Sequence, residues 1–450
     1  MHKVNAGLTV LVRLKTDCVD AASALLVELD AHQERLPFAK SATTHFATIT
    51  VIPAQKYGDK PLPAMLLFAT SFCGPTRVHV SELVRIMGDG LREVLQHCER
   101  FEPSCSDDEL EDFLIYHRHG DTFYSGMQGL SPADVQQHRQ LREAIEEFID
   151  DREAHGGFNG SPLVVRNEIQ KFVLSRPDLA WAEQPVEEST RAWLVFHWRS
   201  LIIEAFLAAL IFCTGAWFGG SSLFGVIAAC GWIAVLAFVV FVAVMWLSIF
   251  EAEHDQTYVA ARTPDDRARF LAATQTRPVI NEFTLAGPIK EEGMLRPAFV
   301  KVSLWVIARV VEGVPWMPYV GSGINIPTVA TARWIAADGG RRLMFISNYT
   351  NEGIAYVRDF IETRGGAMRI NLSFGFGRGF PKTRWLLWDG ALTDPNAYLY
   401  ALSEHQRRTL FWYGPYRDIS IDNIKRNRQI REGLFADYNE DQAKKWLQLL

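Results

Sequence analysis

The sequence predicts an α+β fold in which one β-α-β-β-α-β module occurs twice, with two membrane-spanning helices inserted between the copies. Three observations predict this architecture. Segments from the first part of the chain recur in the same order after residue 280. Each copy alternates strand patterns with amphipathic helix patterns. Residues 201–250, between the copies, are almost entirely apolar.

The recurrence extends over several matched segments. The aligned pairs are 45–52 with 331–338 (with one residue of slack), 66–75 with 343–352, 80–91 with 357–368, and 122–145 with 411–434. Within the last pair, QHRQLREAIE from Gln137 matches RNRQIREGLF from Arg426, so that two arginines, a glutamine and a glutamate recur in register. Self-similarity of this kind indicates a duplicated domain.

Each copy is expected to form a strand, a helix, two strands joined by a turn, and a second helix. The expected strands are 7–14, 46–54 and 64–72 in the first copy, and 281–287, 330–337 and 342–347 in the second. The expected helices are 19–36 and 80–91, then 297–311 and 357–368, and the second helix of each copy should end at a glycine pair, Gly88/Gly90 or Gly365/Gly366. A fourth strand, a helix, a short aromatic strand and a closing helix should follow, although glycine makes 370–380 a poor strand.

This order is the split βαβ, ferredoxin-like arrangement. One such sheet carries helices on a single face, so its other face needs a partner, which the second copy supplies in a pseudo-dimeric α+β barrel. The expected domains are lobe 1 at 1–155, a helical connector at 156–200, a transmembrane helical hairpin at 201–250, a helical linker at 251–279, lobe 2 at 280–436, and a C-terminal helix or tail at 437–450.

The two apolar runs in 201–250 flank a GGSS turn, and each approaches or exceeds the roughly 20 residues that cross a bilayer core. Glu204 is their only ionisable residue. The alternative is a buried helical hairpin of a soluble protein. Arginines flank the hairpin while its turn is uncharged, so we expect both lobes in the cytoplasm at the inner cell membrane. These arginines are Arg191, Arg199, Arg262, Arg267 and Arg269.

Charge and cysteine content exclude several classes of protein. The formal net charge is −6, and no basic face predicts a nucleic-acid partner. The six cysteines form no CxxC pair, so we expect reduced thiols, no disulfide framework and no metal site. The N-terminal residues lack the apolar core of a secretory signal.

Several segments resemble a family of bacterial membrane proteins that carry two ferredoxin-like lobes around a transmembrane hairpin. They are TTHFATITV, LLFATSF and GDGL in the first half, and ATARWIAADGGRRLMFISNY, YVRDFIE and NIKRNRQIREGLF in the second. The resemblance implies a fold and a location but no activity. At fold level the lobes are also similar to the α+β barrels of dye-decolourising peroxidases, chlorite dismutases and small quinone-forming monooxygenases. The GxxDG motif of the peroxidases is not visible, which puts haem chemistry in doubt.

The candidate site residues are of two kinds. Residues kept in both copies could form an anion site or, as the structural alternative, a salt-bridge network; they are Arg139, Arg142, Arg428 and Arg431, with Glu143 and Glu432. Residues that differ between copies could act as general base or axial ligand, or be hydrogen-bonded in the sheet. They are His45, where the second copy has Ala330, and His97 with His117 and His119. Tyr124 and Tyr413 are weaker catalytic candidates that could equally be core residues.

Residues 297–320 are apolar around nearly the whole helix. They predict either an interfacial helix with Trp305, Trp316, Lys301 and Arg309 at the headgroups, or the buried first helix of lobe 2.

Three functions remain open from the sequence. The first is a membrane-anchored protein that binds a small apolar or lipid-like ligand between the lobes. The second is an oxidoreductase or monooxygenase of the α+β-barrel type, and the third is a non-catalytic membrane scaffold for a soluble partner. No cofactor can be named, the bilayer is an expected partner, and a homo-oligomer remains open.

Overall fold

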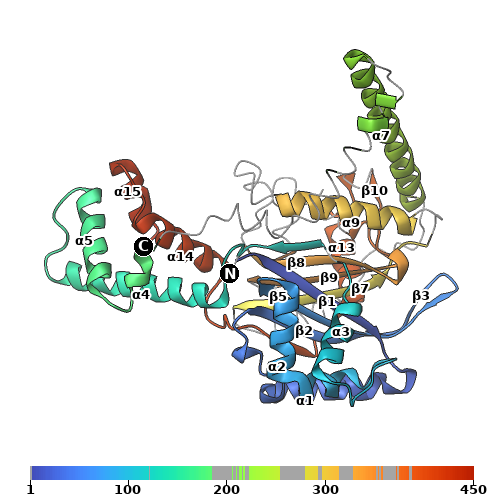
Figure 1. Ribbon diagram of the computed structural model, residues 1–450, viewed down its shortest axis with the longest axis horizontal. Coiled ribbons are helices and arrows are strands. Elements are labelled where there is room, and N and C mark those ends of the chain that lie inside the picture. Colours follow the sequence, from blue (N-terminus) through green and yellow to red (C-terminus); the bar gives the residue numbers. More distant parts are fainter. Residues whose placement is uncertain are drawn as a thin grey trace.

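Figure 1 shows the computed structural model of the 450-residue chain. The structure describes residues 3–120, 122–184, 222–253, 279–291, 296–313, 328–350, 374–384 and 388–450, with isolated positions at 205–217, 353, 356, 357 and 371.

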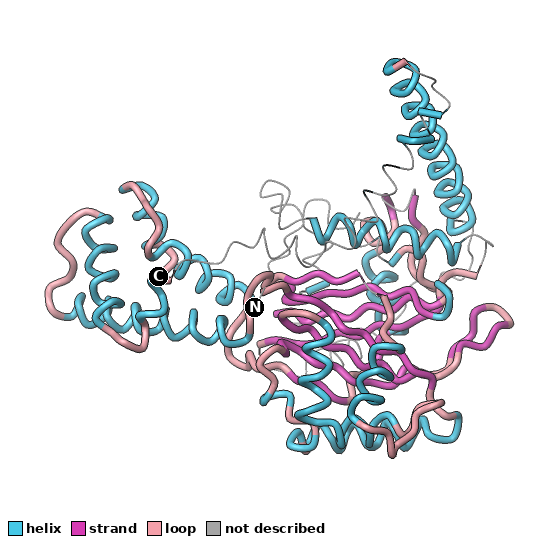
Figure 2. Tube along the Cα trace, in the orientation of Figure 1, coloured by secondary structure: helices cyan, strands magenta, loops and turns pink. Residues whose placement is uncertain are grey.

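Two antiparallel sheets form the centre of the molecule (Figure 2). The first has the order β1 (Asn5–Arg13), β5 (Met65–Cys73), β2 (Thr44–Ile52) and β13 (Phe411–Tyr413). The second has the order β12 (Gln406–Arg407), β7 (Ile280–Pro288), β9 (Arg342–Thr350), β8 (Val329–Ala337) and β6 (Thr122–Ser125). β-Branched and aromatic residues fill the long strands, as expected for pleated, buried segments. The predicted α+β class is confirmed.

Helices cover the outer face of each sheet. Those on the first sheet are α1 (Val19–Ala31), α2 (Thr76–Leu95) and α3 (Asp107–Tyr116). Those on the second sheet are α9 (Arg296–Gly313) and α13 (Pro395–His405). Two small ribbons complete the strands: β3 (Gln55–Tyr57) with β4 (Lys60–Leu62), and β10 (Thr383–Arg384) with β11 (Trp388–Asp389).

The inner faces of the two sheets pack against each other. Leu11 and Leu67 of the first sheet share an apolar cluster with Ala286, Ile335 and Met344 of the second. Alternate residues of the same strands, such as Leu8, Val10 and Val12, point to the helices instead.

Arg333 joins the two sheets through its buried guanidinium. It extends from β8 and donates to Leu8 O at 2.9 Å, Thr9 Oγ1 at 3.1 Å, Thr70 O at 2.9 Å and Ser71 Oγ at 2.7 Å. A buried charge is tolerated only when it is hydrogen-bonded in this way.

Two short strands pair with the sheet built mainly from the other half of the chain. In β6, Tyr124 is paired with Ala332 of β8; in β13, Tyr413 is paired with Ala47 of β2. The exchange is reciprocal, so neither half can complete its sheet alone.

The β2–β5 and β8–β9 pairs also carry matching irregularities. The register shifts between Thr44 and Phe46 in β2, and between Val329 and Thr331 in β8. His45 and Ala330 are therefore the extra residues of two bulges. The correspondence of these two residues is the one expected from the sequence.

Four helices form a bundle beside the sheets (Figure 1). They are α4 (Pro132–Ala154), α5 (Pro162–Ser175), α14 (Ile421–Leu434) and α15 (Glu440–Leu447). They share one apolar core, in which Leu141 and Ile145 meet Ile430, Leu434 and Trp446. The described part of the expected connector at 156–200 and the expected tail at 437–450 thus belong to this bundle.

One helix projects from the body. α7 (Leu223–Glu253) contains a 21-residue stretch, Leu223–Ala243, with a mean hydropathy of 2.8 and no buried part, which is long and apolar enough to cross a membrane. Most of the expected first span lies outside the described residues, although positions 205, 209, 212–214, 216 and 217 are helical. Most of the expected linker, 254–278, also lies outside them.

The expected helix end at Gly88 and Gly90 is wrong. α2 continues to Leu95, with a kink at Met87. Gly90 instead permits close packing, because a Cβ there would lie 2.3 Å from Arg35 O. The second copy's equivalent pair, Gly365/Gly366, lies outside the described residues.

Candidate functional site

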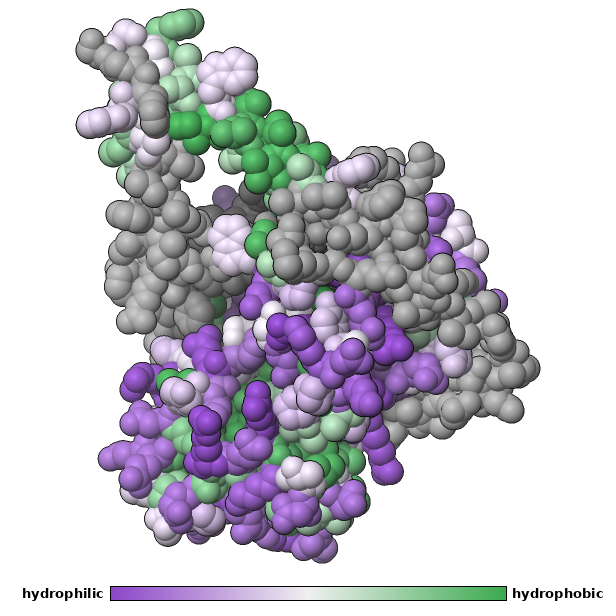
Figure 3. Space-filling view, turned by 90° about the vertical axis from the view of Figure 1, so that its right-hand side faces the viewer, coloured by the Kyte–Doolittle hydropathy of each residue, from purple (hydrophilic) through white to green (hydrophobic). Residues whose placement is uncertain are grey.

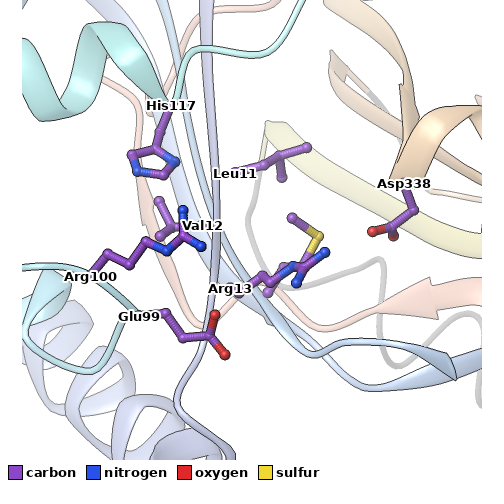
Figure 4. A pocket seen from close by; sticks show the side chains of 8 residues that line it. Leu11, Val12, Arg13, Glu99, Arg100, His117 and Asp338 are labelled. Atoms are coloured by element: carbon purple, nitrogen blue, oxygen red, sulfur yellow. The ribbon is translucent and has the colours of Figure 1, made fainter.

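A cleft of about 360 Å³ opens beside the end of β1 (Figure 4). Leu11, Val12 and Met65 supply its apolar surface. Its polar lining comes from Arg13, Glu99, Arg100, His117 and Asp338.

β1 is an edge strand of its sheet, and the segments that cover this edge bring these residues together. The chain leaving α2 runs along the end of this strand, where Glu99 N donates to Arg13 O at 2.8 Å. The chain leaving α3 runs beside the middle of the strand, where Leu11 N donates to His117 O at 3.3 Å. The edge of β1 is thereby covered, and residues from three distant segments meet there.

Arg100 has a left-handed backbone, with φ of 60°. The equivalent contact occurs at the end of β7 in the second sheet. There Arg378 N donates to Pro288 O at 3.0 Å, as Glu99 N donates to Arg13 O at the end of β1. The next residue there is Gly379, with φ of 81°. A non-glycine residue in this conformation costs about 1–2 kcal/mol. The first half of the chain therefore has an arginine, Arg100, at a left-handed position where the second half has glycine, the residue that adopts this conformation most easily.

Two cationic side chains of the cleft form no ion pair within the described part of the chain, although the carboxylate of Glu99 also lines it. Among the residues that the structure describes, neither the Arg13 nor the Arg100 side chain forms an ion pair or hydrogen bond. The Asp338 carboxylate pairs with a different arginine: its Oδ2 is 3.1 Å from Nε of the buried Arg342. Arg342 also donates to Pro63 O. An anionic ligand could engage both free guanidiniums through paired N–H donors.

His117 is neutral near physiological pH. Burial, and then the nearby Arg100 charge, lower the pKa of its imidazole below the usual value. Its ring lies 4.4 Å from the Phe113 ring, centre to centre. A neutral imidazole offers one donor and one acceptor, so His117 can hydrogen-bond a ligand without adding charge.

The predicted His45 lies elsewhere, in a buried network. Its Nε2 is 2.9 Å from Leu130 O and its Nδ1 is 2.6 Å from Tyr416 Oη. A carbonyl oxygen can only accept, so Nε2 carries the proton and Nδ1 accepts from Tyr416. Burial lowers the His45 pKa to about 4. Both ring nitrogens are occupied, which leaves none for an axial ligand or a general base.

The four predicted arginines lie on α4 and α14 and link these two helices to the segments around them. Arg139 pairs with Glu143 at 2.7 Å and with Asp418, before α14, at 2.8 Å. Arg428 pairs with Glu432 at 2.6 Å and reaches Gln128 O, before α4, at 2.5 Å. An arginine of α4 thus bonds the loop before α14, and an arginine of α14 bonds the loop before α4.

The second arginine of each helix is also engaged. Arg142 donates to Glu146 at 2.7 Å and to Asn427 Oδ1 at 3.4 Å. Arg431 donates to Gln184 O and lies 5.5 Å above the Trp181 ring. These partners match the salt-bridge network that the sequence left open, and the anion site stays an untested prediction.

The remaining predicted residues lie apart from one another. His97 is half-buried near the cleft but does not line it, and burial lowers its pKa. Tyr124 is in the core beneath α9, and Tyr413 stacks on Phe38 at 5.7 Å. Trp305 and Lys301 are exposed on α9, whereas Trp316 and the side chain of Arg309 lie outside the described residues.

The part of the chain that the structure describes contains no group of three metal-binding side chains. Comparison with protein families, with curated proteins and with solved structures gives no match to this chain. The cleft and α7 are therefore the two features of the described residues that indicate a function.

Proposed function

We propose that this chain is a membrane-anchored binding protein that holds a small organic anion in the cleft beside β1. The observation that carries the proposal is the pair of unpartnered guanidiniums, Arg13 and Arg100, in one cleft that apolar side chains also line. In this proposal the arginines bind a carboxylate or phosphate, and the apolar part of the ligand lies against Leu11, Val12 and Met65.

Two other side chains of the cleft can form hydrogen bonds with the ligand. Glu99 can accept a hydrogen bond from a hydroxyl or amino group, and His117 can donate or accept one. A ligand that combines an anionic group with a neighbouring donor therefore fits best. This choice differs from the small apolar or lipid-like ligand expected between the lobes, because four of the eight residues that line the cleft are charged.

We also propose that the chain consists of two ferredoxin-like lobes arranged as a pseudo-dimer. Three matched features support this arrangement: the bulges at His45 and Ala330, the exchanged strands β6 and β13, and the isolated bridges Leu14–Cys98 and Ile289–Gly377. The resemblance to bacterial two-lobed membrane proteins agrees with it.

For the anchor, we propose that α7 and the apolar run beginning at residue 201 form a hairpin in the inner cell membrane. The length and exposure of α7 support a span, and the flanking arginines favour cytoplasmic lobes. Figure 3 shows apolar side chains gathered on the projecting part and hydrophilic ones over the body.

A membrane scaffold for a soluble partner is the second candidate. The inner faces of the sheets are filled by an apolar cluster and by Arg333, which favours a rigid, packed junction between the halves. The oxidoreductase hypothesis has less support, because both nitrogens of His45 are engaged.

The binding proposal is tested by titrating the purified full chain with a panel of small carboxylates and phosphate monoesters, using calorimetry. Arg13→Ala and Arg100→Ala should each weaken the best ligand by about tenfold or more, as expected when one charged hydrogen-bond donor is lost. Arg85→Ala, an exposed arginine on α2, is the matched control and should bind normally. If neither cleft variant changes the affinity, the cleft is not the binding site.

A further inference from the structure

We infer that the outer face of α9 lies in the lipid headgroup layer of the bilayer that α7 crosses. The inference rests on the membrane anchoring proposed above and adds a second contact with the membrane. It also fixes which side of the body faces the lipid: the side of the second sheet.

α9 has one buried face and one exposed face. Val300 is 1% exposed and Leu304 7% exposed, and Thr122 Oγ1 of β6 donates to Leu304 O at 2.8 Å. On the opposite face, Val302 is 46% and Trp305 54% exposed. The buried face fixes α9 against β6 and β8, so the exposed face cannot turn inward.

The orientation of α7 directs that exposed face toward the bilayer. α7 contacts α9 and rises from the side of α9 that faces away from the sheet, and the two helices lie crosswise (Figure 1). A helix that crosses α7 near its base lies along the membrane surface when α7 spans the membrane.

The length of α7 places its base at the headgroups. Its 31 residues extend for about 46 Å at 1.5 Å per residue, against about 30 Å for the hydrocarbon core alone. The stretch Leu223–Ala243 accounts for the core, so the following turns of α7 pass through the headgroup layer.

The exposed residues of α9 suit that layer. Tryptophan prefers the membrane interface, where its ring is shielded and its N–H stays hydrated. Valine contributes apolar area, and the exposed Lys301 can reach anionic headgroups.

The test uses the full chain in vesicles of phosphatidylcholine with a minority of phosphatidylglycerol. The photo-crosslinker p-benzoylphenylalanine replaces one residue at a time at Val302, Trp305, Trp232 and Tyr116. Trp232 lies on α7 within the span and is the positive control, and the exposed Tyr116 on α3 is the negative control. Adducts are measured by intact-protein mass spectrometry after irradiation.

We expect lipid adducts at Val302, Trp305 and Trp232, several-fold above the level at Tyr116. Adducts at Trp232 with only the Tyr116 level at Val302 and Trp305 would overturn the inference and leave the anchor intact. Background levels at Trp232 as well would overturn the anchor itself. A crosslink from Trp305 to a second copy of the chain would show that protein, not lipid, covers this face.

Discussion

Mild acid should destabilise the folded chain because three buried histidines must stay neutral. Burial lowers the pKa of His45 to about 4, that of His79 to about 3 and that of His138 to about 4. The unfolded chain, with histidine pKa values near 6.5, binds protons first as the pH falls. The stability is therefore complete above about pH 6.5 and is lost between that pH and the folded-state values.

The surroundings of His79 explain why its charged form is so unfavourable. The ring stacks on Phe72 at 4.0 Å, with Nδ1 2.8 Å from Thr43 Oγ1 and Nε2 2.8 Å from Thr70 Oγ1. Thr43 donates its hydroxyl to Glu82, so it accepts from Nδ1–H. Nε2 is then an acceptor in the neutral ring, and protonation would break this arrangement.

The size of the effect follows from the proton count. Each histidine costs about 1.4 kcal/mol per pH unit below its unfolded pKa, or about 2 kcal/mol at about pH 5. Three histidines together remove about 6 kcal/mol, a large part of the stability of a typical domain.

Urea unfolding of the full chain in detergent, followed by near-ultraviolet circular dichroism at several pH values, measures this loss. Replacing His79 with glutamine should lower the overall stability and reduce the slope of stability against pH by about one proton. Equal stability at about pH 7.5 and about pH 5 would refute the reasoning. An unchanged slope in the variant would show that His79 does not titrate as described.

Two further predictions concern the junction between the halves. Arg333→Met should lower the free energy of unfolding by about 3 kcal/mol in urea titration, because it removes the four hydrogen bonds that this buried guanidinium donates to β1 and β5; a loss below about 1 kcal/mol would contradict the bridging role. Gly126→Ala, next to β6, should cost about 2 kcal/mol by the same measurement, because its Cβ would lie 2.4 Å from Val329 O of β8. Gly120→Ala, where a Cβ meets nothing within 4 Å, is the control and should be nearly neutral.

The sequence predicted the three long strands of each copy and the correspondence of His45 with Ala330, because alternation and segment alignment are local signals. The fourth strand expected in the first copy is wrong: the chain between α2 and β6 forms α3 and isolated bridges at Cys98 and Arg118. It did not predict the strand exchange. TFYS and FWY align with each other, but strands of three or four residues carry no information about which sheet they join. The position of His45 was predicted, but its engagement with Tyr416 depends on a contact between residues 371 positions apart.

The cleft was harder to predict for a related reason. Its polar groups come from the end of β1, the exits of α2 and α3, and the β8–β9 turn, and no single segment contains more than two of them. His117 lies in a cluster of histidines in the sequence, whereas no sequence pattern distinguishes Arg13 or Arg100 from other arginines. The left-handed backbone of Arg100 indicates a special position only when it is compared with the equivalent Gly379 in the second half.

The variant Arg100→Gly tests most directly whether Arg100 binds the ligand of the cleft from a strained backbone position. Its free energy of unfolding and its affinity for the best cleft ligand should be measured on the same preparation. We predict that stability stays equal or rises by up to about 1 kcal/mol, as backbone strain is relieved, while affinity falls about tenfold or more. A clear loss of stability together with undiminished affinity would contradict the account.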